Sequence, residues 1–207
     1  MKNKWTGKIG NKAVKISLLV ICVMVCLSSL AGAAQLSGIV FNENFQDQGI
    51  NMKLQGMGLK TVFFFKAFVA GFYTNDMKQA SLPAESSQRI EVEYFVNIPA
   101  RKLSQFTVEQ MKLNISPVEF GLIQKQIKLM AQYFVDLKPG DRFSLTYIPG
   151  TGTKFAHNGR LTGIIQGSLF ARALFAVWIG QKPFDKQLKE QICGLSKEQQ
   201  VHRKVDL

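Results

Sequence analysis

The most informative stretch of the sequence is Gly56–Tyr73, GMGLKTVFFFKAFVAGFY. Its central part, Val62–Tyr73, carries a single charge, Lys66, and is far too short to span a membrane. The β-branched and aromatic residues favour strands buried on both faces, and the glycines favour places where backbones approach closely or bulge. We therefore predict two consecutive strands within residues 52–74.

Alternation with a period of two predicts further strands and an antiparallel meander. Arg89–Val96 alternates Ile, Val and Tyr with Glu and Phe. After the turn at Lys138–Asp141 a strand is predicted at Arg142–Ile148, and the hairpin turn Asn158-Gly159 precedes another at Leu161–Gln166. The run Gly150–Thr153 joins strands and opens no helix, so we interpret it as hairpin geometry rather than a phosphate-binding loop.

The first predicted helix begins near Pro99. Four residues share one of its faces at helical spacing: Leu103, Phe106, Gln110 and Leu113. We expect this face to pack on the sheet. Gln110 then places a polar group where an apolar one is usual.

The second predicted helix has the clearest start signal, a capping box formed by Ser116 and Glu119 with proline at the first helical position. Its apolar side carries Ile123, Ile127, Met130, Phe134 and Leu137, which predicts one continuous helix. Two more helices are predicted. One is capped by Ser168 and stops at Gly180, and a short one covers Asp185–Cys193.

The N-terminal residues have the pattern of a secretory signal peptide. Residues 1–15 contain five lysines and no acidic residue, and the uncharged run Ile16–Leu30 follows them. Ala31 and Ala33 have the small side chains that a signal peptidase requires, which predicts cleavage before Ala34 and an exported, periplasmic protein. An uncleaved anchor is the alternative, because the uncharged run approaches the roughly 20 residues of a spanning helix.

Cleavage would leave about 174 residues, enough for one well-buried domain and too few for two. We predict a signal peptide at 1–33, one domain at 34–195 and a polar tail at 196–207. Cys193 is the one cysteine left after cleavage, so no intramolecular disulfide can form. We expect its thiol to be buried and inert.

The chain carries 26 Lys and Arg against 14 Asp and Glu, a formal net charge of +12. Loss of the signal peptide would leave 21 basic and 14 acidic residues, or +7, a charge compatible with proximity to anionic membranes. The basic residues are scattered, which argues against nucleic-acid binding. His157 stands beside a predicted turn without a partner at ligand spacing, so we expect a solvated histidine, no metal site and no cofactor.

Two lysines, Lys60 and Lys66, lie in the most apolar part of the chain. On an extended backbone they share parity with Phe64 and Phe68. A cation on an apolar wall is suited to an anionic ligand. The alternative is that both side chains extend their ammonium groups to water or to a partner at the sheet edge.

Several of these stretches, in this order and spacing, resemble the bacterial chalcone isomerase-like proteins. The matching stretches are Gly56–Thr61 leading into Phe63–Tyr73, then Pro149–Thr153, Asn158-Gly159, Gly163–Gly167, and Phe170–Gly180 with Pro183. The resemblance covers nearly all of the predicted domain. It implies an α+β open-faced sandwich, with an antiparallel sheet, a layer of helices on one face and a ligand cleft between them.

The resemblance also implies where a site would lie. Plant members of the fold that are isomerases use a pocket arginine, a threonine, a tyrosine and an asparagine. The threonine position falls on Phe68, the tyrosine position on Leu103 and the asparagine position on Gln110, and Lys60 is the cation nearest the arginine position. Both hydroxyls are therefore lost, which favours binding over catalysis.

Three functions remain open on the sequence alone. The first is non-catalytic binding of a fatty acid or similar apolar carboxylate, with its head near Lys60 or Arg101 and its tail along Phe64, Phe68 and Leu103. The second is isomerase chemistry on an unknown substrate. The third is a ligand-free structural or interaction role in the cell envelope. A cavity of a few hundred cubic ångströms would favour the first, and a filled interface the third.

Overall fold

The computed structural model describes residues 33–76 and 85–195. The described residues from Ala34 onward belong to one compact unit. The signal peptide predicted for residues 1–33 lies outside the described residues except for Ala33, and the predicted tail at 196–207 lies outside them entirely. Both stay predictions.

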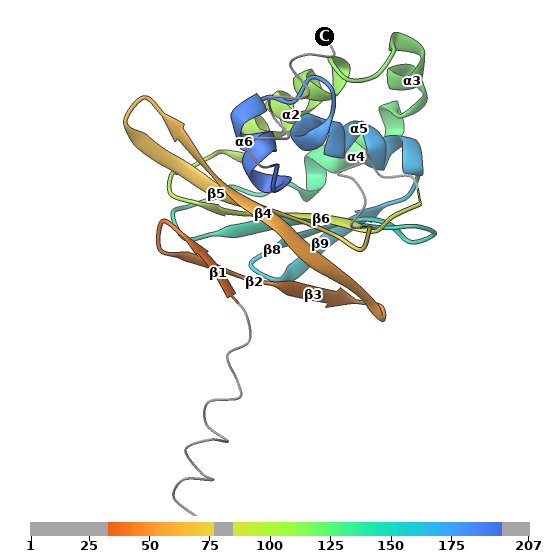
Figure 1. The fold of residues 1–207 in the computed structure, drawn as a ribbon. Helices are drawn as coiled ribbons and strands as arrows, with labels where there is room; N and C mark the ends of the chain where they lie inside the picture. The colour runs from red at the N-terminus through yellow and green to blue at the C-terminus, as the bar shows by residue number, and fades with distance from the viewer. Residues whose placement is uncertain (1–32, 77–84, 196–207) are drawn as a thin grey trace, which may run out of the picture. The chain divides into compact units, whose positions relative to one another are not determined.

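The central element is a curled antiparallel sheet whose seven strands follow one another in chain order (Figure 1). The strands are β3 (Asn44–Asp47), β4 (Ile50–Val62), β5 (Phe65–Thr74), β6 (Gln88–Tyr94), β7 (Arg142–Ile148), β8 (Gly152–His157) and β9 (Arg160–Ile165). A separate hairpin of β1 (Ala33–Leu36) and β2 (Ile39–Asn42) lies on the other side of the sheet from the helices (Figure 1). The predicted meander is thus present, including both strands of the Gly56–Tyr73 stretch.

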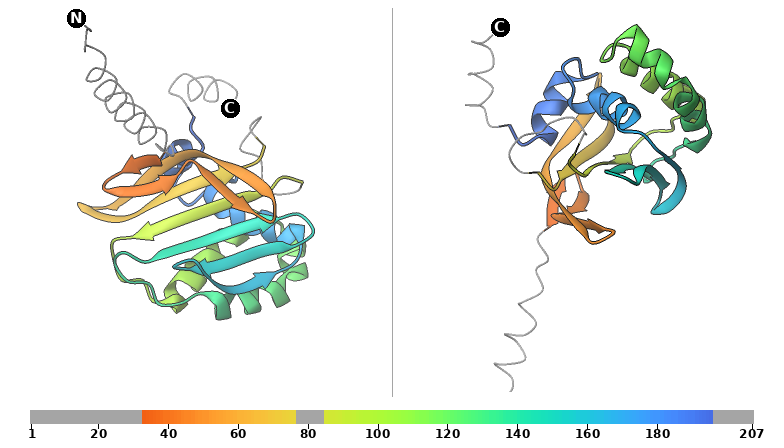
Figure 2. Two further views of the ribbon diagram at one scale, coloured as in Figure 1. Left: turned by 90° about the horizontal axis from the view of Figure 1, so that it is seen from below. Right: turned by 90° about the vertical axis from the view of Figure 1, so that its right-hand side faces the viewer.

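All the helices that the structure describes lie on one face of this sheet (Figure 2). They are α2 (Ala100–Lys112), α3 (Pro117–Leu122), α4 (Gln124–Tyr133), α5 (Ser168–Ile179) and α6 (Lys186–Ile192). This arrangement confirms the predicted α+β class, an antiparallel sheet with a helical layer on one face.

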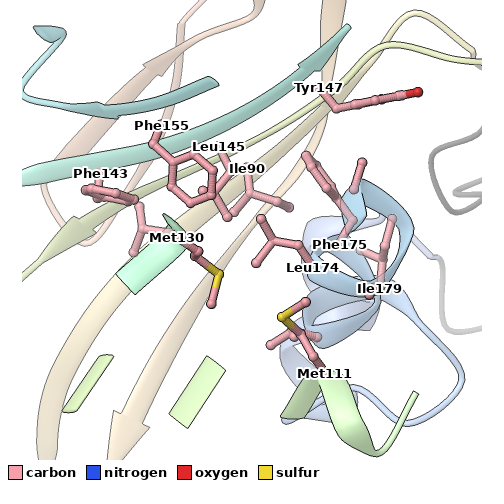
Figure 3. Packing of buried hydrophobic residues seen from close by; sticks show 14 of the residues in the cluster. Ile90, Met111, Met130, Phe143, Leu145, Tyr147, Phe155, Leu174, Phe175 and Ile179 are labelled. Atoms are coloured by element: carbon pink, nitrogen blue, oxygen red, sulfur yellow. The ribbon is translucent and has the colours of Figure 1, made fainter. Parts of the chain in front are cut away.

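Two hydrophobic clusters hold the layers together. The larger lies between the sheet and the helices, where Ile90 and Leu145 of the sheet face Leu174 of α5 (Figure 3). The smaller, on the opposite face, packs the β1–β2 hairpin through Phe41 against β5 residues such as Tyr73. The second half of β5 is therefore buried on both faces, as its composition predicts, whereas the end of β4 is exposed.

The glycines of β4 let α6 approach the strand directly. A Cβ atom at Gly56 would lie 2.2 Å from the backbone carbonyl oxygen of Gln191, and one at Gly58 would lie 2.6 Å from the side chain of Leu188. Any larger residue would force α6 away from the sheet. The close approach predicted from these glycines is confirmed.

Two helix predictions need correction. The second predicted helix is divided at Ile123, whose φ of −104° and ψ of 14° end α3 before α4 begins. The break follows Gly121, a residue type that favours helix poorly. The predicted capping box is present and the five apolar residues are buried, but α4 ends at Tyr133, so Phe134 and Leu137 lie beyond the helix. In α5 the N-cap is Gly167 rather than Ser168, whose side chain makes no capping bond.

The inner face of α2 also differs from the prediction. Its buried residues are Ser104, Thr107 and Met111, one position beyond the predicted stripe, whereas Phe106 is 41% exposed and Leu113 is 54% exposed. One residue corresponds to a rotation of about 100°. Small polar residues can face the core here because the Thr107 hydroxyl donates to the backbone carbonyl of Leu103 at 2.8 Å.

Candidate ligand-binding site

A cavity of about 20 Å³ lies between the sheet and the helical layer. Its sheet side is formed by Ile90, Val92, Tyr94, Phe143 and Leu145, and its other side by Leu103, Thr107, Phe134, Leu174 and Trp178. No charged side chain is among these described lining residues. A space of this size holds about one water molecule, so the interface is nearly filled.

Two hydroxyl groups line this otherwise apolar cavity. Tyr94 is only 4% exposed and lines the cavity. Burial raises the pKa of Tyr94 well above that of a free tyrosine, so the group stays a neutral O–H donor at any physiological pH. The Thr107 hydroxyl donates to its own helix and keeps the capacity to accept a hydrogen bond. The cavity can therefore both offer and accept one hydrogen bond.

An aromatic cluster adjoins the cavity at Trp178. Its members are Phe68, Phe106, Trp178 and Phe184, with ring centroids 5.1 Å apart for Trp178–Phe184, 5.6 Å for Phe106–Phe184 and 6.0 Å for Phe68–Trp178. Phe68 also contacts Tyr94 at 5.7 Å, while Phe106 reaches the surface. The cluster thus runs from the cavity wall to the outside of the molecule.

An ion pair lies beside this cluster. The Nζ atom of Lys60 is 2.6 Å from a carboxylate oxygen of Asp185, and the two side chains are 30% and 17% exposed. Lys60 is the register partner of Phe68, and Asp185 directly follows Phe184. Asp185 also caps α6 by accepting from the N–H of Leu188 at 2.9 Å. The pair therefore fastens the start of α6 to β4.

The surroundings of the Asp185 carboxyl group favour its ionised form. Burial alone would raise the pKa of Asp185. The hydrogen bond from Lys60, the N–H of Leu188 and the charge of Lys60 together outweigh burial, so the pKa of this carboxyl is lowered. Lys60 already holds a carboxylate in this structure, and that carboxylate belongs to the chain itself.

The structure brings together only some of the residues predicted to bind a ligand. Leu103 lines the cavity, Phe68 belongs to the aromatic cluster, and Lys60 lies beside that cluster. The alternative predicted for Lys60, an ammonium group that reaches a partner, is the one observed.

Four other predicted residues do not reach the cavity. Phe64 and Lys66 are exposed at the end of the β4–β5 hairpin. Arg101 is exposed on α2. Gln110 is half-buried on α2, where its backbone carbonyl accepts from the side chain of Asn114.

Sequence reasoning missed Tyr94, Thr107, Trp178 and Phe184. Tyr94 had a usable signal, since it shares parity with Ile90 and Val92 in a predicted strand. Thr107 lies one position outside the predicted inner face of α2, so no sequence pattern pointed to it. Phe184 is in a loop, and only the packing of α6 brings it to Trp178.

The described residues contain no group of three or more metal-ligating side chains. His157 is half-buried at the turn before β9, with its Nε2 atom 3.3 Å from Asp141. Cys193 is partly buried rather than fully buried. Among the described helices, none is long and apolar enough to cross a membrane.

A curled antiparallel sheet under one helical layer, with an apolar cavity between the two, defines an α+β protein of the open-faced sandwich class. Comparison with known families then gives the particular assignment. The sequence model of the family described as chalcone isomerase-like matches residues 33–194. The chain belongs to this family.

Solved structures agree with this assignment at the level of the fold. The crystal structure of a fatty-acid binding protein of Arabidopsis thaliana is similar, with a TM-score of 0.63 and 18% sequence identity over 78% of this chain and 96% of that one. An identity this low shows the fold alone. No curated protein sequence matches the chain significantly.

Proposed function

We propose that this protein binds a fatty acid or similar apolar carboxylate between its sheet and its helical layer, without catalysing a reaction. The observation that carries the proposal is the Lys60–Asp185 ion pair beside the aromatic cluster that adjoins the cavity. A carboxylate already bound to Lys60 marks the position that a ligand head group would take. The likeness to a fatty-acid binding structure supports this choice of ligand.

The structure corresponds to the closed form of such a binder. A cavity of about 20 Å³ cannot hold an acyl chain, because sites for ligands of that size occupy roughly 300–1,000 Å³. Entry therefore requires the aromatic cluster to move. Phe184 is the member that moves most readily, since it lies in the short loop between α5 and α6.

We infer an exchange of carboxylates during entry. The ligand carboxylate displaces Asp185 from Lys60, which releases the start of α6 together with Phe184. The acyl chain then replaces the aromatic side chains along Leu103 and Trp178. Because Asp185 and the ligand compete for one ammonium group, this ion pair sets both the affinity and the opening of the site.

Titration of the protein beginning at Ala34 with palmitate tests the proposal, with binding followed by calorimetry and by the NMR signal of a ¹³C-labelled carboxylate. Lys60→Met should weaken binding at least about tenfold, since it removes a charge-assisted hydrogen bond. Lys66→Met is the matched control, because this lysine is exposed on the same hairpin. Its affinity should equal that of the unchanged protein.

Asp185→Asn gives the sharper result. It removes the competing charge, so palmitate should bind about tenfold more tightly even though the free protein is less stable. A protein that takes up no palmitate, or whose uptake ignores residues 60 and 185, would contradict the proposal.

One observation favours a ligand-free interaction role instead, namely the nearly filled interface around the 20 Å³ cavity. The same titration separates the two functions. Complete absence of uptake, together with unchanged unfolding temperature at saturating palmitate, would support the interaction role, since any ligand bound to the folded state raises that temperature.

A second observation keeps isomerase chemistry in view. The buried Tyr94 hydroxyl is a neutral donor that could stabilise a developing oxyanion, although the hydroxyl positions implied by the family carry Phe68 and Leu103. Incubation with a chalcone and measurement of its visible absorbance tests this directly. Turnover that disappears in Tyr94→Phe would establish an isomerase and displace the binding proposal.

A further inference from the structure

The end of the β4–β5 hairpin is the most exposed apolar feature of the described chain. Phe63, Phe64 and Phe65 are 90%, 96% and 75% exposed, and Val62 beside them is 48% exposed. We call residues 62–65 the aromatic tip. Phe63 and Phe64 form the turn and Phe65 begins β5, so the high exposure of all three shows that no other described element covers this end of the hairpin. Figure 1 shows this hairpin projecting beyond its neighbours.

The turn in this tip is unusual within its own protein. The other two-residue hairpin turns of the described residues are Ser37-Gly38, Gln48-Gly49 and Asn158-Gly159, each with glycine in the second position and positive φ at both residues. The tip has Phe63-Phe64, and Phe63 adopts a φ of 54°. A bulky residue in this region is strained, and such strain concentrates at functional sites. The tip therefore carries aromatic surface at a position where glycine would be less strained.

The charges around the tip are of one sign. Residues 48–75 contain Lys53, Lys60 and Lys66 and no acidic residue. Lys60 is neutralised by Asp185, whereas Lys66 is exposed directly beside the tip. An apolar end with a cation at its base complements an anionic lipid surface, where aromatic rings enter the interfacial region and lysine stays at the head groups.

The size of the tip argues against a protein partner. Three phenylalanines and one half-exposed valine offer about 600 Å² of apolar surface. A stable protein interface needs about 800 Å² from each partner, usually on a flatter surface. A bilayer sets no such minimum, because a narrow projection can enter it from above.

We propose that the aromatic tip inserts into the interface of an anionic lipid bilayer and docks the protein there through Phe63, Phe64 and Phe65, with Lys66 at the lipid phosphates. This inference stands without the proposed function, since its residues lie outside the cavity and the ion pair. If both hold, docking brings the protein to the phase from which an apolar carboxylate is taken.

Flotation with vesicles tests the proposal, using the protein that begins at Ala34. This part forms its own compact unit and contains both hydrophobic clusters, and its starting point leaves out the predicted signal peptide. The vesicles are pure phosphatidylcholine, or an equal mixture with phosphatidylglycerol. The triple variant Phe63→Ser, Phe64→Ser, Phe65→Ser should lose at least about tenfold in partitioning to the mixed vesicles.

The matched control is the double variant Val118→Ser, Leu122→Ser, which removes apolar side chains that are 75% and 69% exposed on α3. Its partitioning should stay unchanged. Lys66→Ala should partition about fivefold less to the mixed vesicles, and its partitioning to pure phosphatidylcholine vesicles should not change. Circular dichroism checks that each variant remains folded, as expected for exposed positions.

Insertion itself is seen with Phe64→Trp and lipids brominated along the acyl chain. The new indole should be quenched beyond the background from Trp178, measured in the unchanged protein. Three results would overturn the proposal. The first is a triple variant that floats with the vesicles as well as the unchanged protein. The second is an α3 variant that loses partitioning while the triple variant keeps it. The third is a dimer, seen by sedimentation without vesicles, that the triple variant abolishes, which would make the tip a self-association surface.

Discussion

The two ends of the β4–β5 hairpin have nearly the same composition and opposite environments. At the far end, residues 69–74 of β5 are buried on both faces, with Ala70 and Phe72 in the larger cluster and Val69 and Tyr73 in the smaller. At the near end, Phe63–Phe65 are exposed to solvent. Composition alone predicts burial for both. What differs is cover, because the helical layer reaches the hairpin as far as Lys60 and Phe68, and the β1–β2 hairpin packs on β5 residues such as Val69 and Tyr73.

The largest contrast is expected from the same substitution at the two ends. Phe72→Ala, at a fully buried ring, should lower the free energy of unfolding by about 3–5 kcal/mol. Phe64→Ala should change it by no more than about 0.5 kcal/mol. Urea unfolding followed by circular dichroism measures both. Similar losses would show that the tip is covered by something in solution.

Gly56 is the register partner of Phe72 and lies against α6. Substituting it therefore tests whether this close approach of α6 keeps the far end of the hairpin covered. Gly56→Ala places a Cβ atom against the Gln191 carbonyl and should cost about 1–3 kcal/mol by displacing α6. Gly121→Ala, in α3 with open space around the new methyl, should stabilise the protein by up to about 1 kcal/mol. Thermal unfolding of the pair gives the comparison, and a Gly56→Ala protein as stable as the original would show that α6 tolerates a shift.

Lys60 lies in the part of the β4–β5 hairpin that the helices cover, and Lys66 lies in its exposed part. Lys60→Met should cost about 1 kcal/mol at pH 7, because the ion pair is only partly buried, and Lys66→Met should cost nothing measurable. The lowered pKa of Asp185 fixes the pH dependence. The stabilisation is complete above the unfolded-state pKa of about 4 and is lost as the pH falls through the lower folded-state pKa. The unfolding curves of the original and Lys60→Met should therefore converge once the pH is below the lowered folded-state pKa of Asp185.

The smallest effect is expected at Tyr94, the register partner of Phe68 where the buried region begins. Tyr94→Phe removes a polar group from a ring that is only 4% exposed and should stabilise the protein by about 0.5–1 kcal/mol, because burial of a hydroxyl is costly. Calorimetric unfolding measures the gain. A loss of stability would reveal a bound water that satisfies the hydroxyl in solution.

Much of the fold follows from local pattern. Alternation predicts β6, the turn at Lys138–Asp141 predicts the start of β7, the Asn158-Gly159 turn predicts the β8–β9 hairpin, and the Ser116 capping box predicts the start of α3. The family is also accessible from sequence, because its motifs are turns and glycine contacts that only certain residues can form. The candidate site is less accessible. Of the residues lining the cavity, only Leu103 was predicted, since one register step on α2 hid Thr107.

By itself the sequence determined strands β4–β7 and β9, helices α2, α5 and α6, the Ser116 capping box and the Asn158-Gly159 turn, because these depend on neighbours within a few positions. The tertiary structure decided which apolar surfaces are covered and which charges are paired. Lys60 meets Asp185 across 125 positions, and Phe68 meets Trp178 only because α5 folds back over the sheet. The same chemistry therefore gives a buried core at one end of a hairpin and a bare aromatic tip at the other. Burial is a property of what the rest of the chain brings against a segment, and no window of local sequence contains it.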